Sequence, residues 1–98
     1  MSDEVPISPA ERRRARLRFR AERRGFKEVD LIFGAFAAEF LGDLTDAELD
    51  QFEALLAAAD QDVFAWLKNE APVSQAYDTP VFAKLQSLCM RKNPTWNV

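Results

Sequence analysis

The apolar residues between positions 29 and 40 recur at intervals of three and four, and this spacing constrains the fold more than any other feature of the sequence. The residues in question are Val29, Ile32, Phe33, Phe36, Ala37 and Phe40. An α-helix repeats every 3.6 residues, so such a series forms one face that can be buried. No stretch of the 98 residues alternates with the period of two that is typical of a half-buried strand. The sequence therefore predicts an all-α fold.

Start signals for further helices divide the chain into a small bundle of about five helices. The letters SPAE at 8–11 and TDAE at 45–48 each place a capping hydroxyl three residues before a glutamate, and TP at 79–80 places a cap before a proline. We expect helices from 9 to about 24, from about 26 to a stop at Gly42, from 46, and from 80 to before Pro94. Asp60 is expected to cap a short helix that carries Trp66 and cannot pass Pro72.

The length of the chain allows one hydrophobic core, so we expect a single domain over residues 1–98 with flexible ends at 1–8 and 93–98. No apolar run approaches the roughly 18 residues of a membrane-spanning helix. The first residues, MSDEVPISPA, match neither a secretory signal nor a good organellar presequence. The expected compartment is the cytoplasm, or the mitochondrial matrix if the source is eukaryotic.

The chain has no histidine and one cysteine, Cys89, which argues against catalysis and metal binding. Cys89 and Trp66 are each expected to be buried in the core. The acids between Asp43 and Asp62 lack the order and central glycine of a calcium loop, so a solvated helix face is favoured. We expect a protein that is not an enzyme and that holds no metal and no tightly bound cofactor.

The charges are separated along the chain. Residues 11–27 hold eight arginines and one lysine against two acids, a net charge of +7, whereas residues 28–70 hold eleven acids against one lysine, a net charge of −10. Like charges four residues apart in the first helix each cost about 0.2–0.5 kcal/mol. Either the acidic third helix or an external acidic surface must offset this cost.

Binding of nucleic acid by the arginine-rich helix, or an antitoxin-like regulatory adaptor that uses it, is the alternative function that these charges suggest. The sequence pI of about 4.9 and the single interleaved aromatic, Phe19, speak against nucleic acid.

The junction between the first two helices holds a glycine that follows two arginines, with an acid three residues farther on. Gly25 can take the left-handed conformation that ends a helix, with Arg23 and Arg24 favourably placed at a helix C-terminus. The same corner could instead present the Arg24 guanidinium to a partner, with Glu28 meeting it across the bend. The spacing leaves both interpretations open.

A family resemblance bears on this choice. The order Arg-Gly-x-x-Glu at Arg24, Gly25 and Glu28, followed by Asp30 and then by LTDAELDQFEALL and DQDVFAWL, resembles the small bacterial and mitochondrial assembly factors that promote covalent flavinylation of succinate dehydrogenase. The likeness extends over about residues 19–70. The short motif is weak alone, but its combination with the two later elements in the right order is specific.

The resemblance implies a chaperone-like helical bundle that binds the flavoprotein subunit of succinate dehydrogenase and promotes attachment of FAD to a histidine of that subunit. FAD would belong to the partner, and a fumarate reductase flavoprotein is a second candidate client. Carried over residue by residue, Arg24, Gly25 and Glu28 would form the partner-binding motif, with Arg23 and Asp30 beside it. The corner would position the partner rather than supply a nucleophile.

Overall fold

The computed structural model describes residues 8–92 and is all-helical over that range. Its elements are α1 (Pro9–Glu22), α2 (Lys27–Phe40), the 3-10 turn η1 (Leu41–Asp43), α3 (Asp46–Ala57), α4 (Asp60–Leu67), the 3-10 turn η2 (Gln75–Tyr77) and α5 (Pro80–Lys92). The described residues contain five α-helices and no strand, as the apolar spacing predicts. The expected flexible ends, 1–8 and 93–98, lie outside this range except for Ser8, which is the N-cap of α1.

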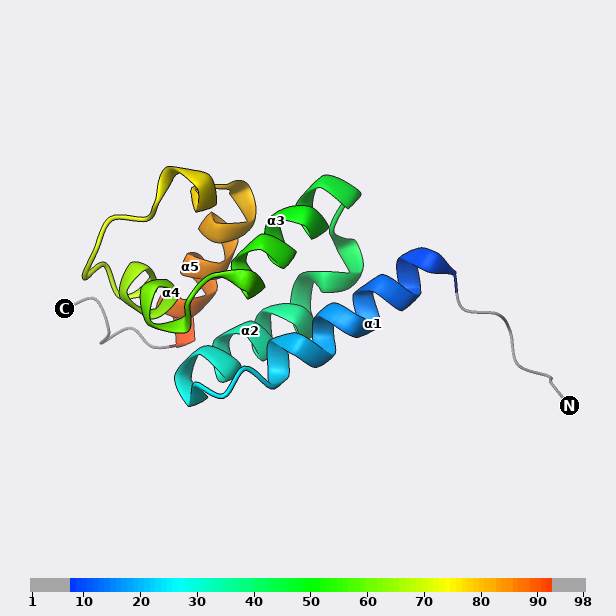
Figure 1. Ribbon diagram of the computed structural model, residues 1–98, viewed down its shortest axis with the longest axis horizontal. Helices are drawn as coiled ribbons and strands as arrows, with labels where there is room; N and C mark the ends of the chain where they lie inside the picture. Colours follow the sequence, from blue (N-terminus) through cyan, green and yellow to red (C-terminus); the bar gives the residue numbers. More distant parts are fainter. Residues whose placement is uncertain (1–7, 93–98) are drawn as a thin grey trace, which may run out of the picture.

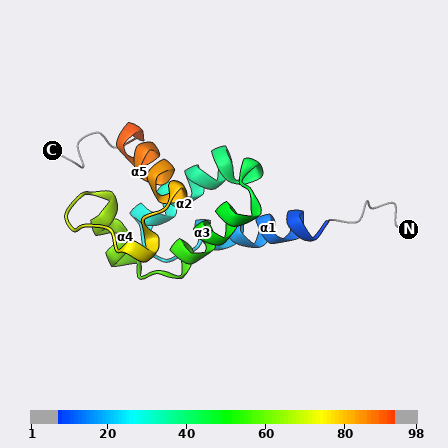
Figure 2. The same cartoon turned by 90° about the horizontal axis from the view of Figure 1, so that it is seen from above.

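The helices pack as an antiparallel pair with the remaining three arranged across it (Figure 1). α1 packs along α2, and α3 contacts both α1 and α5. α2 also contacts α4 and α5, which brings the C-terminal helix back onto the second helix (Figure 2). The α1–α2 corner therefore lies beside the α3–α4 junction, although the two are more than 30 residues apart in the sequence.

The core is a single cluster of buried side chains to which all five helices contribute. The ring of Phe52 stacks on Phe36 with centroids 5.3 Å apart and meets Phe33 edge-on at 5.7 Å. Rings in these arrangements gain about 0.5–1.5 kcal/mol beyond the burial of their area. Trp66 is buried against Tyr77 and Phe82, and Cys89 is buried as well, so both side chains take the expected core positions.

The expected caps are present at three of the helix starts. Ser8 and Thr45 each complete a reciprocal capping box with the glutamate three residues later, and the Thr79 hydroxyl accepts a hydrogen bond from the Phe82 backbone N–H. Hydrogen bonding over three residues is a local event, which is why the sequence predicts it well.

Three expected boundaries are wrong. α1 ends at Glu22 rather than near Arg24, because Arg23 leaves the helical conformation (φ −136°, ψ 54°). α2 ends at Phe40, and Gly42 lies within the tighter turn η1 that follows. Asp60 is the first residue of α4 rather than its cap, which is Ala59. The carboxylate of Asp60 is bonded to an arginine instead.

Candidate functional site: the corner between α1 and α2

The corner is the four-residue turn 23–26, and a glycine makes it tight. Gly25 has φ +93°, a conformation that residues with a Cβ rarely adopt, as the sequence predicts for this position. A Cβ built on Gly25 would meet no heavy atom within 4 Å. The glycine is therefore required by backbone conformation, and the space above it is open to a visitor.

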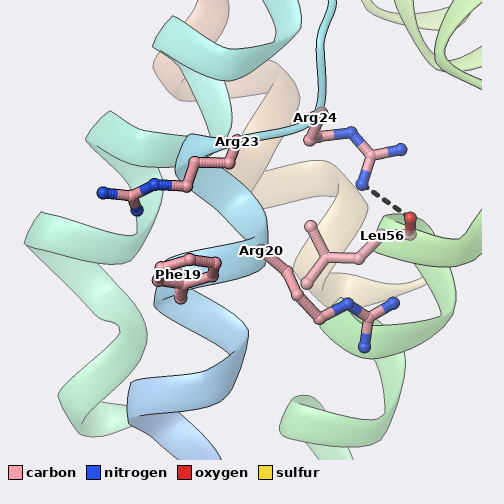
Figure 3. A pocket seen from close by; sticks show the side chains of 5 residues that line it. All are labelled: Phe19, Arg20, Arg23, Arg24 and Leu56. Carbon is pink, nitrogen blue, oxygen red and sulfur yellow. Dashed lines mark hydrogen bonds between the residues drawn. The ribbon is translucent and has the colours of Figure 1, made fainter.

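Arg24 does not reach outward from this corner. Its side chain is only 8% exposed and turns toward the α3–α4 junction. One terminal nitrogen donates to the backbone oxygen of Leu56 at 2.6 Å (Figure 3). The other terminal nitrogen donates to the backbone oxygen of Ala58 (3.1 Å), and Nε donates to Asp60 Oδ1 (2.6 Å). The guanidinium carbon also lies 5.0 Å from the centroid of the Phe33 ring. All these contacts are internal, and they tie the corner to the end of α3.

This geometry corrects the expected pairing of Arg24 with Glu28. The counterion of Arg24 is Asp60, which is 36 residues away in the sequence, and not the carboxylate four residues on. The reason is that the chain leaves the helical path between the two residues, so the (i, i+4) spacing no longer places them on one face. Arg24 is a brace within the fold, because its guanidinium bonds to internal acceptors.

Asp30 is a second brace of the corner. Its Oδ1 accepts a hydrogen bond of 2.8 Å from the backbone N–H of Arg24, and the side chain reaches back six residues to do so. It lies in the first turn of α2, where a negative charge is favoured by the helix dipole. The turn is thus held at two points. The Asp30 carboxylate accepts from its backbone, and the Arg24 guanidinium bonds to the α3–α4 junction.

Glu28 of the motif and Arg23 beside it are exposed charged residues of the corner. Glu28 is exposed, and its carboxylate makes no hydrogen bond or ion pair with any residue in the range 8–92. The Arg23 guanidinium lies 4.1 Å from the centroid of the Phe19 ring (Figure 3). It also lies 3.5 Å from the Glu22 carboxylate. With Gly25 between them, these residues form the accessible side of the corner.

An open hollow of about 290 Å³ lies under the corner, between the ends of α1 and α3. It is lined by Phe19, Arg20, Arg23, Arg24 and Leu56 (Figure 3). Three of the five lining residues are arginines, and each of them is paired with a carboxylate of the fold.

The fold also settles which arginines of the first helix meet the acids of the third. Arg13 donates to Asp50 (2.6 Å) and Glu53 (3.0 Å), and Arg20 lies 3.5 Å from Glu53. The hydrogen bonds to Asp50 and then to Glu53 raise the pKa of Arg13 above its usual value. The acidic third helix does offset the crowding of positive charge on α1, as one of the two interpretations of the sequence requires.

Asp60 is the residue of this region that the sequence-based interpretation missed. It is the first residue of the DQDVFAWL element that carries part of the family resemblance, and that position could have indicated a role beyond capping. No group of three or more acidic or thiol ligands within the described part of the chain could hold a metal ion. Among the helices described, none has the length and apolar character needed to cross a membrane.

Comparison with known proteins agrees with the motif. The model of the family described as "Flavinator of succinate dehydrogenase" matches residues 15–89. The proteins named "Succinate dehydrogenase assembly factor 2, mitochondrial" from Dictyostelium discoideum and Yarrowia lipolytica are 34% and 35% identical over 83 and 86 residues. These alignments cover 85% and 84% of this chain and 59% of each relative. A relative from Drosophila mojavensis, assembly factor 2-A, is 34% identical over 83 residues, which are 83% of this chain and 53% of that protein.

The chain spans about half the length of the curated relatives it matches. Those relatives are named as assembly factors rather than enzymes. The family match covers more than half of the chain, including the whole corner and the α3–α4 junction that braces it. The chain belongs to the family of flavinators of succinate dehydrogenase.

Proposed function

We propose that this protein binds the flavoprotein subunit of succinate dehydrogenase and promotes the covalent attachment of FAD to a histidine of that subunit. The family membership supports a role in assembly of this enzyme. The absence of histidine from the 98 residues fits a linkage that forms on the partner. FAD belongs to the partner in this scheme, and this chain binds none tightly. A fumarate reductase flavoprotein is the second candidate client.

The observation that carries the proposal is that some residues of the corner bond to the fold while others are left exposed. The polar groups of Arg24 and Asp30 make hydrogen bonds within the fold. By contrast, the space beside Gly25 is open, and the Glu28 carboxylate has no partner in residues 8–92. A surface that is rigid before binding loses less conformational entropy when it binds. The corner therefore suits the task of holding another protein in one arrangement.

The proposed mechanism is positioning. Glu28 offers a carboxylate to a donor on the flavoprotein, and the bare backbone at Gly25 allows close approach of the client. The bound corner holds the domains of the flavoprotein so that its attacking histidine and FAD remain aligned. Alignment of two reacting groups can supply a large part of a rate enhancement without any catalytic group from this chain. The reaction would take place in the cytoplasm of a bacterium or in the mitochondrial matrix of a eukaryote.

The test is a reconstitution with purified apo-flavoprotein, FAD and this chain, followed by in-gel fluorescence of covalently bound flavin. Glu28→Gln removes the outward charge and leaves the braces intact, and Gly25→Arg fills the open space. Glu39→Gln is the matched control, because it makes the same change at an exposed position near the other end of α2. We expect slower flavin attachment with Glu28→Gln and Gly25→Arg and unchanged attachment with Glu39→Gln.

Two results would count against the proposal in different ways. Flavin attachment that is the same with and without this chain would remove the function. Attachment that depends on the chain but is unaffected by both Glu28→Gln and Gly25→Arg would keep the function and remove the corner from it.

A further inference from the structure

A line of exposed side chains runs along one side of α1. Arg12, Arg16 and Phe19 lie on one side of the helix at intervals of four and three residues, and Arg23 continues the line just past its end. We call these four residues the outer ridge. All four are exposed.

The outer ridge differs from the inward arginines of the same helix in what it contacts. Arg13 is held by acids of α3, and Arg14 donates to the backbone oxygens of Leu41 (3.1 Å) and Leu44 (2.7 Å). Arg16 makes no hydrogen bond and no ion pair with any residue that the structure describes. The inward arginines thus have a structural explanation, but folding gives no reason for a guanidinium at position 16.

Phe19 is the second unexplained feature of the outer ridge. It is 58% exposed and carries the Arg23 guanidinium over its ring. A shallow hollow of about 480 Å³ runs beside it, lined by Arg12, Ala15, Arg16, Phe19 and Arg20. An exposed aromatic flanked by arginines is the composition enriched in the energetically important part of protein interfaces.

We propose that the outer ridge is a second docking surface of this protein, which binds an acidic segment of the same flavoprotein that the corner engages. The inference rests on the proposed function. The ridge and the corner are continuous, because Arg23 belongs to both and because Phe19 and Arg24 line the same hollow. A client seated on Gly25 and Glu28 is thereby brought against the ridge.

The positive charge of the outer ridge favours a negatively charged segment as its binding partner. Guanidinium groups pair well with carboxylates, often through two parallel hydrogen bonds. The chain as a whole has a formal charge of −3, and residues 28–70 carry a net charge of −10. This surplus of acids repels a long polyanion such as nucleic acid more than it repels a short acidic segment. The ridge also offers one aromatic ring, too few for a series of stacked bases.

The outer ridge should therefore affect the affinity for the client, whereas the corner should affect the attachment of flavin. Complementary charges at the rim of an interface accelerate encounter, and they are screened by salt. Loss of the ridge should therefore weaken capture of the client, while the corner still aligns histidine and FAD once the client is bound. Salt should weaken binding by the intact protein more steeply than binding by a variant without Arg16.

The experiment measures binding of this chain to purified apo-flavoprotein of succinate dehydrogenase across a salt series. The variants are Arg16→Gln alone and Arg16→Gln with Phe19→Ala. The matched control is Arg18→Gln, which removes one charge from an exposed position of α1 that faces Glu22 instead. We expect the double variant to raise Kd by about tenfold and to flatten the salt dependence, as for loss of an aromatic anchor with its charged neighbour. The control should stay within about twofold of the wild type, as for a surface ion pair.

Further readouts separate the two proposals. Covalent flavin formed at saturating concentrations should equal that of the wild type, and unchanged melting temperatures should show that the exposed substitutions leave the fold intact. Wild-type Kd values in both ridge variants would overturn the docking surface and leave the corner standing. Wild-type protein that does not bind the flavoprotein would overturn both proposals. Micromolar binding of a 20-nucleotide single strand that is lost in the double variant, with client binding unchanged, would assign the ridge to nucleic acid and overturn the inference.

Discussion

The guanidinium of Arg24 is bonded to the carboxylate of Asp60, a residue 36 positions farther along the chain, and through it the first corner of the fold is fastened to the start of α4. The arginine belongs to the Arg-Gly-x-x-Glu motif that carries the family resemblance, yet its side chain is only 8% exposed. Its neighbours in the motif, Gly25 and Glu28, remain exposed, and Arg24 fastens the corner that holds them.

Replacement of Arg24 tests the brace. Arg24→Ala leaves the Asp60 carboxylate and the backbone oxygens of Leu56 and Ala58 without their donor. We expect the free energy of unfolding, measured by urea denaturation, to fall by about 2–3 kcal/mol, the usual cost of unpairing hydrogen-bonded charged groups. Asp60→Ala should also be destabilising, because it leaves the buried Arg24 guanidinium without its counterion. A change below about 0.5 kcal/mol for Arg24→Ala would contradict the bracing role.

Gly25 and Gly42 form a matched pair for a test of backbone strain. A Cβ added at either position would meet no heavy atom within 4 Å, but only Gly25 has a positive φ. Gly25→Ala should therefore lower the free energy of unfolding by about 1–2 kcal/mol. Gly42→Ala should be neutral or stabilising by up to about 1 kcal/mol. The same urea denaturation measures both, and similar effects at the two glycines would show that φ is not the cause.

The capping box of α3 predicts a dependence of stability on pH. The backbone hydrogen bond from Thr45 is the largest cause that lowers the pKa of Glu48 below its ordinary 4.5, and Lys84 contributes less. A lowered pKa in the folded state means that the ionised carboxylate stabilises the protein above pH 4.5, and that this contribution is lost as pH falls through the folded-state pKa.

Glu48→Gln should accordingly be less stable than the wild type near neutral pH, and the difference should shrink as pH falls below 4.5. Thermal unfolding followed by circular dichroism over this range gives the comparison. A difference that stays constant with pH would mean that the carboxylate charge plays no part. Glu39→Gln, on the exposed surface of α2, is the control for loss of a surface charge together with its ion pair, here to Arg91.

Cys89 is predicted to be unreactive in the folded protein. The side chain is buried on α5, and burial raises the pKa of its thiol to about 11 from an ordinary 9.0. Since the thiolate is the reactive form, a thiol reagent at pH 8 should label the native protein far more slowly than the urea-unfolded chain. Labelling at equal rates in the two states would place the thiol at the surface.

Helix starts and the core face could be predicted from the sequence because both depend on residues three or four positions apart. The capping boxes at Ser8 and Thr45, the buried phenylalanines of α2 and the positive φ of Gly25 all follow from such local rules. The ends of α1 and α2 were less well predicted, since no single residue stops either helix and the chain unwinds over several positions.

The sequence by itself determined that this protein is a small helical bundle with an Arg-Gly-x-x-Glu corner. Helix periodicity, caps and short motifs depend only on residues a few positions apart. Only the tertiary structure decided that the Arg24 charge is paired inside the fold and that the Glu28 charge is left exposed. Arg24 could have met Glu28, yet the turn separates these two and packing brings Asp60 within 2.6 Å. Ion-pair choice depends on which helices lie side by side, and that depends on burial of the whole core rather than on distance along the chain.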